Sequence, residues 1–105
     1  MTEQQYKIRM HTPIGDREGT LYAQISGWTI TGYLNLLNHT ELFGGVIDSL
    51  GNCRISGKLV TLIKAVPFTA SGEILPKKLR LSLTADQNRH FQITGFPAEE
   101  TEDAV

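Results

Sequence analysis

Several features that identify a protein's class at a glance are missing from this sequence. Its 105 residues include a single cysteine, Cys53, which excludes an internal disulfide. The longest apolar run covers residues 59–63, far too few to span a membrane. The first ten residues lack the apolar core of a secretory signal. We therefore expect a small cytoplasmic protein with no membrane segment.

Strong charge of either sign is also missing, because the net charge is −1. Four acids, however, lie in the last seven residues, and the remaining seven acids and ten bases leave the body at about +3. The tail has no apolar periodicity and follows Pro97. The sequence predicts one β domain over residues 1–98 and an acidic, disordered tail over residues 99–105.

What the sequence has throughout is alternation of apolar and polar residues. Leu79, Leu81 and Leu83, for example, each have a polar neighbour on both sides. This period of two is typical of strands that bury one face. Turn-forming residues recur about every eleven positions. The prediction is an all-β fold without significant helix, a small single-domain antiparallel β-barrel or strongly curved sandwich of about seven to eight short strands.

Two segments are ambiguous in this scheme. Residues 32–43 could form a helix, but they lack a clear cap, so we favour two strands with a turn at Asn38. Over residues 53–74 the apolar phase reverses without a turn residue at the reversal. Either one long strand is bulged near Pro67, or two strands meet at an unmarked tight turn.

Glycines recur in Ile-Ser-Gly and Ile-Thr-Gly units within the expected strands. None belongs to a phosphate-binding loop. Such glycines allow a small barrel to curve, and they make room inside it for Phe43, Phe68 and Phe91. In the alternative interpretation, the missing side chains leave a cavity for a small apolar ligand. Phe43, Phe68 and Phe91 would then line that cavity, with His39 at its mouth.

The spacing of these glycines and turns also resembles a small bacterial glycine-rich β domain, lipocalin-like or barrel-like. That domain is found alone or appended to larger bacterial enzymes. The resemblance covers most of residues 6–96 and implies a barrel-like fold without implying a reaction or catalytic residues. The positions that match its pattern are Thr12, Pro13, Gly15, Gly19, Leu21, Gly32, Leu34, Phe43, Gly45 and Asp48.

Few residues suggest chemistry. The three histidines lack the spacing of a metal site, and no cofactor motif is present. The best catalytic candidates are His39 and Glu41, which share a strand face and would lie at the barrel mouth if Phe43 points inward. A solvated turn is the simpler interpretation of this pair. The charged stretch 16–18 is interpreted as a hydrophilic turn, and Cys53 as a partly buried structural cysteine.

Apolar residues also occupy positions where one-sided strands should be polar. Exposed apolar surface on a small protein indicates an interface, so we predict a homo-oligomer, of which a dimer is the commonest form. Nucleic acid is not an expected partner, because no aromatic residues alternate with the basic residues at 77–80. The predicted interface residues are Leu37, Val60, Leu62, Tyr22, Tyr33 and Trp28.

Three functions follow from these patterns. The favoured one is a non-catalytic module that binds a small ligand or acts as an accessory interaction domain. The second is a small enzyme that uses His39 and Glu41 at the barrel mouth. The third is a purely structural oligomerisation partner of a larger bacterial protein.

Overall fold

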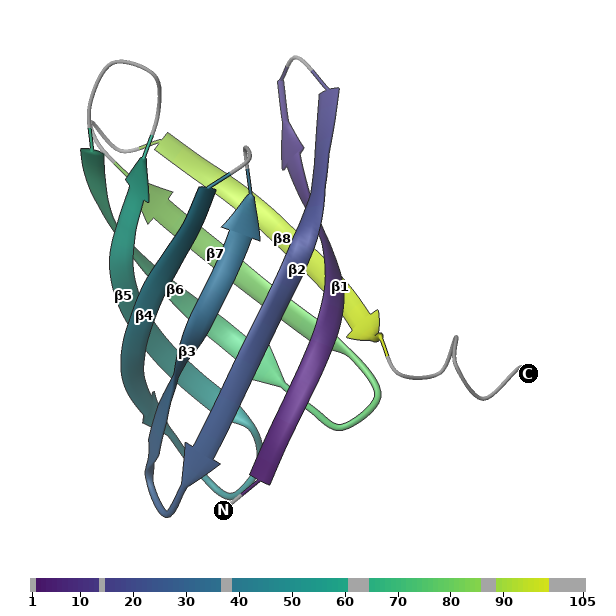
Figure 1. The fold of residues 1–105 in the computed structure, drawn as a ribbon, viewed down its shortest axis with the longest axis vertical. Helices are drawn as coiled ribbons and strands as arrows, with labels where there is room; N and C mark the ends of the chain where they lie inside the picture. Colours follow the sequence, from purple (N-terminus) through teal and green to yellow (C-terminus); the bar gives the residue numbers. More distant parts are fainter. Residues whose placement is uncertain (1, 14, 37–38, 61–64, 86–88, 99–105) are drawn as a thin grey trace.

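The computed structural model describes residues 2–13, 15–36, 39–60, 65–85 and 89–98. These residues form strands and turns and contain no helix, so none that could span a membrane (Figure 1). The eight strands are β1 (Thr2–Thr12), β2 (Gly15–Ser26), β3 (Thr29–Leu36), β4 (His39–Ile47), β5 (Asn52–Val60), β6 (Ala65–Ile74), β7 (Leu79–Ala85) and β8 (Arg89–Pro97).

Each strand pairs antiparallel with the next one along the chain, and β8 returns to pair with β1. The register between β1 and β2 runs from Thr2 opposite Ile25 to Thr12 opposite Gly15. The closing register between β1 and β8 runs from Tyr6 opposite Pro97 onwards. Of the two predicted architectures the structure is the barrel, which leaves no sheet edge unpaired.

Both ambiguous segments consist of two strands. Residues 32–43 belong to β3 and β4, as predicted, although the expected turn at Asn38 lies outside the described residues. Over residues 53–74 the chain forms β5 and β6, which pair in register from Asn52 opposite Glu73 to Val60 opposite Ala65. The reversal of phase therefore marks a new strand and not a bulge.

Alternation of apolar and polar residues along the strands determines which side chains form the core. In β1, Tyr6, Ile8 and Met10 are buried while the residues between them are exposed. In β7 the three leucines are buried in the same way. Fully burying one such side chain contributes about 1.5–3 kcal/mol, which drives the closed sheet to form. The buried apolar residues are Tyr6, Ile8, Met10, Leu21, Ala23, Ile30, Leu34, Leu36, Phe43, Ile47, Cys53, Ile55, Phe68, Ala70, Ile74, Leu79, Leu81, Leu83 and Ile93.

Glycines on the inward face of the strands leave room for large side chains in the core. A Cβ on Gly32 would lie 1.9 Å from the carbonyl oxygen of Tyr22 and 3.1 Å from Cζ of Phe43. A Cβ on Gly57 would lie 3.1 Å from Cε2 of Phe68. The architectural interpretation of the glycines is confirmed at these two positions, because each one faces the ring of a buried phenylalanine.

Hydrogen bonds join the turns at the lower end of the barrel in Figure 1. The amide of Ile47 donates to the carbonyl oxygen of Trp28 at 3.0 Å, and the amide of Ile74 donates to that of Gly51 at 2.8 Å. The hydroxyl of Tyr6 donates to the carbonyl oxygen of Leu75 at 2.6 Å. The β2–β3, β4–β5 and β6–β7 turns and β1 are thereby linked to one another at this end.

Candidate functional site

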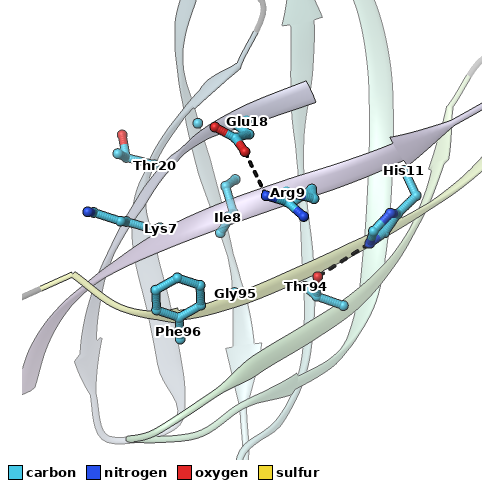
Figure 2. A pocket seen from close by; sticks show the side chains of 10 residues that line it. Lys7, Ile8, Arg9, His11, Glu18, Thr20, Thr94, Gly95 and Phe96 are labelled. Carbon is cyan, nitrogen blue, oxygen red and sulfur yellow. Dashed lines mark hydrogen bonds and ion pairs between the residues drawn. The ribbon is translucent and has the colours of Figure 1, made fainter. Parts of the chain in front are cut away.

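A groove of about 600 Å³ lies on the outer wall of the barrel, over β2, β1 and β8 (Figure 2). We call it the outer groove. Its floor is the middle of β1 at Ile8, which pairs with Gly19 of β2 and Gly95 of β8. The floor is backbone, because Ile8 and its two glycine partners lie on the inward phase, and a row of outward side chains stands on each side of it. The lining residues are Lys7, Ile8, Arg9, His11, Glu18, Gly19, Thr20, Thr94, Gly95 and Phe96.

The strand registers define the two rows. On one side of the floor, Arg9 pairs with Glu18 of β2 and Thr94 of β8. On the other side, Lys7 pairs with Thr20 of β2 and Phe96 of β8. Side chains directly opposite each other on antiparallel strands are close enough to interact. Each row is therefore a set of neighbours, although its members lie far apart in the sequence.

The first row is held by ion pairs and hydrogen bonds. Nη2 of Arg9 lies 2.7 Å from Oε2 of Glu18, and Nε of Arg9 lies 4.0 Å from Oδ2 of Asp16. Asp16 also contacts Nδ1 of His11 at 3.1 Å through Oδ1. Nε2 of His11 lies 3.4 Å from Oγ1 of Thr94. The guanidinium charge of Arg9 is thus already balanced by carboxylates.

The second row has a cation without such a partner. Lys7 forms no ion pair with the part of the chain that the structure describes. It pairs across the strands with Phe96, whose exposed fraction is 55%. In Figure 2 both side chains stand at the same end of the groove, away from the dashed contacts of Arg9 and His11. This end combines an ammonium group, an exposed ring and the hydroxyl of Thr20.

The contacts of His11 have the order found in hydrolase triads, with a hydroxyl on one ring nitrogen and a carboxylate on the other. In such enzymes the carboxylate is buried and the surrounding site excludes water. Here the side chains of His11 and Asp16 are 44% and 45% exposed. We therefore assign these contacts to fixing the His11 ring at the wall of the groove.

The predicted mouth residues lie at the opposite end of the barrel from the joined turns. Glu41 is half-buried and lies on the same phase of β4 as Phe43, which is buried. The side chain of His39 lies outside the described set, so its pairing with Glu41 stays a prediction. Phe43 and Phe68 are buried in the core and Phe91 packs against it. Their role in contacting a ligand also stays a prediction.

The predicted interface residues are only partly described. Tyr22 and Tyr33 lie on the outer wall, and their rings stack with centroids 5.3 Å apart. Trp28 is 67% exposed in the turn between β2 and β3. Leu37, Leu62 and the side chain of Val60 lie outside the described residues.

The prediction for the charged stretch 16–18 was wrong in one respect. These residues belong to β2 and pair with β1, because the hairpin continues to Thr12 opposite Gly15. The signal that could have found this was the alternation of Asp16 and Glu18, which matches that of Arg9 and His11. Opposite charges spaced two apart on both sides of a short connection favour cross-strand pairs.

Cys53 is buried and 7% exposed, as expected for a structural cysteine. Burial, followed by the nearby charge of Asp48, raises the pKa of its thiol to about 11. A thiol with so high a pKa is a poor nucleophile at neutral pH. Among the residues described, no group of three or more histidine, cysteine or acidic side chains could hold a metal ion.

These features define the chain as a small closed antiparallel β-barrel with a polar groove on its outer wall. The sequence matches no protein family model, and no curated protein or solved structure shows significant similarity to it.

Proposed function

We propose that this barrel is a non-catalytic binding module whose ligand is a small organic anion with a flat apolar part, held in the outer groove. The observation that carries the proposal is the ammonium of Lys7, which has no ion pair within the described segments, beside the exposed ring of Phe96. The groove volume of about 600 Å³ falls within the range of small-molecule sites, about 300–1,000 Å³.

The chemistry of the ligand follows from the two rows. The Lys7 ammonium favours a carboxylate, sulfonate or phosphate, because a charged hydrogen bond is stronger than a neutral one. The Phe96 ring favours a flat apolar group that would cover its exposed face. The hydroxyls of Thr20 and Thr94 stand on opposite sides of the floor and offer further hydrogen bonds.

An amide NMR titration tests this proposal with three probes: 1-naphthoate, its neutral analogue 1-naphthalenemethanol, and inorganic phosphate. We expect the largest shifts with naphthoate, centred on residues 7–9, 18–20 and 94–96. Lys7→Gln should raise the Kd for naphthoate about threefold to tenfold, as expected for an exposed charge contact. Phe96→Ser should raise it by a similar factor, and should also remove the response to the neutral analogue.

Lys58→Gln is the matched control, because it removes an exposed lysine from β5, far from the groove. It should leave the Kd for naphthoate unchanged. Equal losses for Lys7→Gln and Lys58→Gln would show that naphthoate responds to net charge alone. Shifts centred on Phe43, Phe68 and Phe91 would place the ligand inside the barrel and overturn the proposal.

The other functional hypotheses remain predictions. They are catalysis by His39 and Glu41, a structural role beside a larger bacterial protein, a small apolar ligand inside the barrel, and a cytoplasmic location. The resemblance to lipocalin-like bacterial domains also remains a prediction. The predicted homo-oligomer also remains a prediction.

A further inference from the structure

A second outer surface lies on the other side of β2 and is apolar. Tyr22 of β2 pairs with Tyr33 of β3, which pairs with Leu42 of β4. The two rings are stacked, and the side chain of Leu42 is 76% exposed. We call the row Tyr22, Tyr33 and Leu42 the Tyr–Leu face. Figure 1 shows its three strands side by side across the front of the barrel.

A notch adjoins this row. Gly44 lies between Leu42 and Val46 on the outward phase of β4 and pairs with Thr31. A Cβ on Gly44 would meet nothing closer than Cγ2 of Thr31 at 3.8 Å. Val46 is 58% exposed. The surface is therefore hollowed at Gly44 and raised on either side of it by an exposed aliphatic side chain.

Charges of opposite sign stand at the two margins of this surface. On the β1 margin stands Glu3. Desolvation, followed by the nearby carboxylate of Glu3, raises the pKa of the Tyr22 hydroxyl, so Glu3 lies beside the row. On the β5 margin, Arg54 pairs with Val46, and Lys58 follows the pair of Phe43 and Gly57. All three charged side chains are exposed.

The two margins are equally far from the centre, because β1 and β5 are each two strands from β3. Beside Leu42, Gly44 and Val46, the charged residue of the β1 margin is Glu3 and those of the β5 margin are Arg54 and Lys58; Lys7 lies beyond the row, opposite Thr20. These charges make the surface complementary to its own copy turned about an axis along β3. That rotation brings Glu3 of each copy towards Arg54 and Lys58 of the other. A two-fold axis perpendicular to the strands would instead bring like charges together, which costs free energy.

We propose that the Tyr–Leu face binds a second copy of this chain in a dimer whose two-fold axis runs parallel to the strands over β3. Each Tyr22 ring then covers Leu42 of the second copy, and the two Tyr33 side chains meet near the axis. Gln24, which pairs with Thr31, lies opposite the notch at Gly44 of the second copy. A symmetric face-to-face contact of this kind is the commonest form of self-association.

This dimer leaves the outer groove open, because the groove lies beyond Glu3 along β1, at residues 7–11, and before Tyr22 on β2, at residues 18–20. The proposal is therefore independent of the ligand proposal, and either can fail alone. Tyr22 and Tyr33 are among the interface residues predicted from the sequence, whereas Leu42 and the charged margins are not.

Sedimentation equilibrium over a wide range of protein concentrations provides the first test. We expect a reversible dimer, and Leu42→Ser should raise its Kd at least tenfold. Leu50→Ser is the matched control, because Leu50 is 73% exposed in the turn between β4 and β5, away from the row. It should leave the dimer unchanged. Both leucines are exposed, so neither variant should affect folding.

A charge exchange tests the axis. Glu3→Lys and Lys58→Glu should each weaken the homodimer, because like charges would then meet across the interface. Mixing the two variants should restore association as a heterodimer, because both margin contacts become attractive again. With one variant labelled uniformly with 15N, native mass spectrometry of the mixture separates the heterodimer from the two homodimers by mass.

Three results would overturn the proposal. One is a wild-type protein that stays monomeric at about 1 mM, since a dimer weaker than this would correspond to a free energy of association of only about −4 kcal/mol. The second is a dimer that Leu50→Ser breaks and Leu42→Ser does not. The third is a mixture of charge variants that gives no heterodimer, which would contradict an axis along β3.

Discussion

The outer wall of this barrel has two sides that differ sharply, although the same kind of core lies behind both. On the β8–β1–β2 side, Arg9, His11 and Glu18 form ion pairs and hydrogen bonds. On the β2–β3–β4 side, Tyr22, Tyr33 and Leu42 form an apolar row. Inward residues are constrained by packing, whereas outward residues are free to vary. Both proposals rest on this difference between the two sides.

The largest difference in stability is expected between substitutions at an inward glycine of β3 and an outward glycine of β4. Gly32→Ala would place a Cβ 1.9 Å from the carbonyl oxygen of Tyr22, so the backbone of two strands must move. Gly44→Ala meets no atom closer than 3.8 Å. We expect the first variant to lose about 4 kcal/mol or more of the free energy of unfolding, and the second to stay within about 0.5 kcal/mol of wild type.

Urea unfolding followed by circular dichroism measures both values. Gly44→Ala has a second use, because a methyl group at the notch should weaken the proposed dimer while the fold stays intact. Equal stability of the two variants would contradict the assignment of Gly32 to the packed interior.

An intermediate change in stability is expected at the turn between β4 and β5, which contains Asp48. Desolvation raises the pKa of the Asp48 carboxyl, but hydrogen bonds from Asn52 and the turn backbone outweigh it, so the pKa lies below its ordinary value of 3.8. Oδ1 of Asp48 accepts from the amides of Leu50 at 2.8 Å and Asn52 at 3.0 Å. Because the folded pKa is depressed, this stabilisation is complete above the unfolded pKa and is lost as the pH falls through the folded pKa.

Asp48→Asn removes this titration and leaves an amide group that cannot accept all of the same bonds. Urea unfolding from about pH 6 to about pH 3 should show wild type more stable than the variant at the upper end, with the gap closing below pH 4. A gap that is constant or widens in acid would contradict a role for the ionised carboxylate.

The smallest change in the free energy of unfolding is expected for a substitution in the outer groove. Arg9→Gln breaks the 2.7 Å contact with Glu18, but the side chains are 53% and 71% exposed. Exposed ion pairs contribute less than about 1 kcal/mol, so the free energy of unfolding should change by no more than that. Thermal unfolding at low and high salt measures the change. A larger loss would mean that the groove side is needed for the fold and would weaken the comparison.

Much of this fold was predictable because alternation is a local signal. The leucines of β7 and the apolar residues of β1 indicate their inward face without knowledge of their partners. The two strands within residues 53–74 were harder to predict, since the reversal of phase has no glycine, proline or asparagine to mark it. The pairing of the two segments with each other shows that they are separate strands, β5 and β6, since no turn-forming residue marks the boundary.

The outer groove could not be predicted in the same way. Lys7 and Phe96 become neighbours only because β8 closes on β1, and the closing register depends on the whole barrel. Leu42 was similarly hidden, because its outward direction follows from the inward direction of Phe43, which the sequence left conditional. Sites formed across strands require the register, which a single strand does not contain.

The central claim is that the two sides of the outer wall bind different partners. Its most direct test is a pair of amide NMR experiments on one sample. The first adds 1-naphthoate at constant protein concentration, and the second dilutes the protein without ligand. The account predicts ligand shifts at residues 7–9, 18–20 and 94–96, and dilution shifts at residues 22–24, 31–33 and 42–44. Ligand and dilution shifts that fall on the same residues would contradict it, because the two sides would then serve one function.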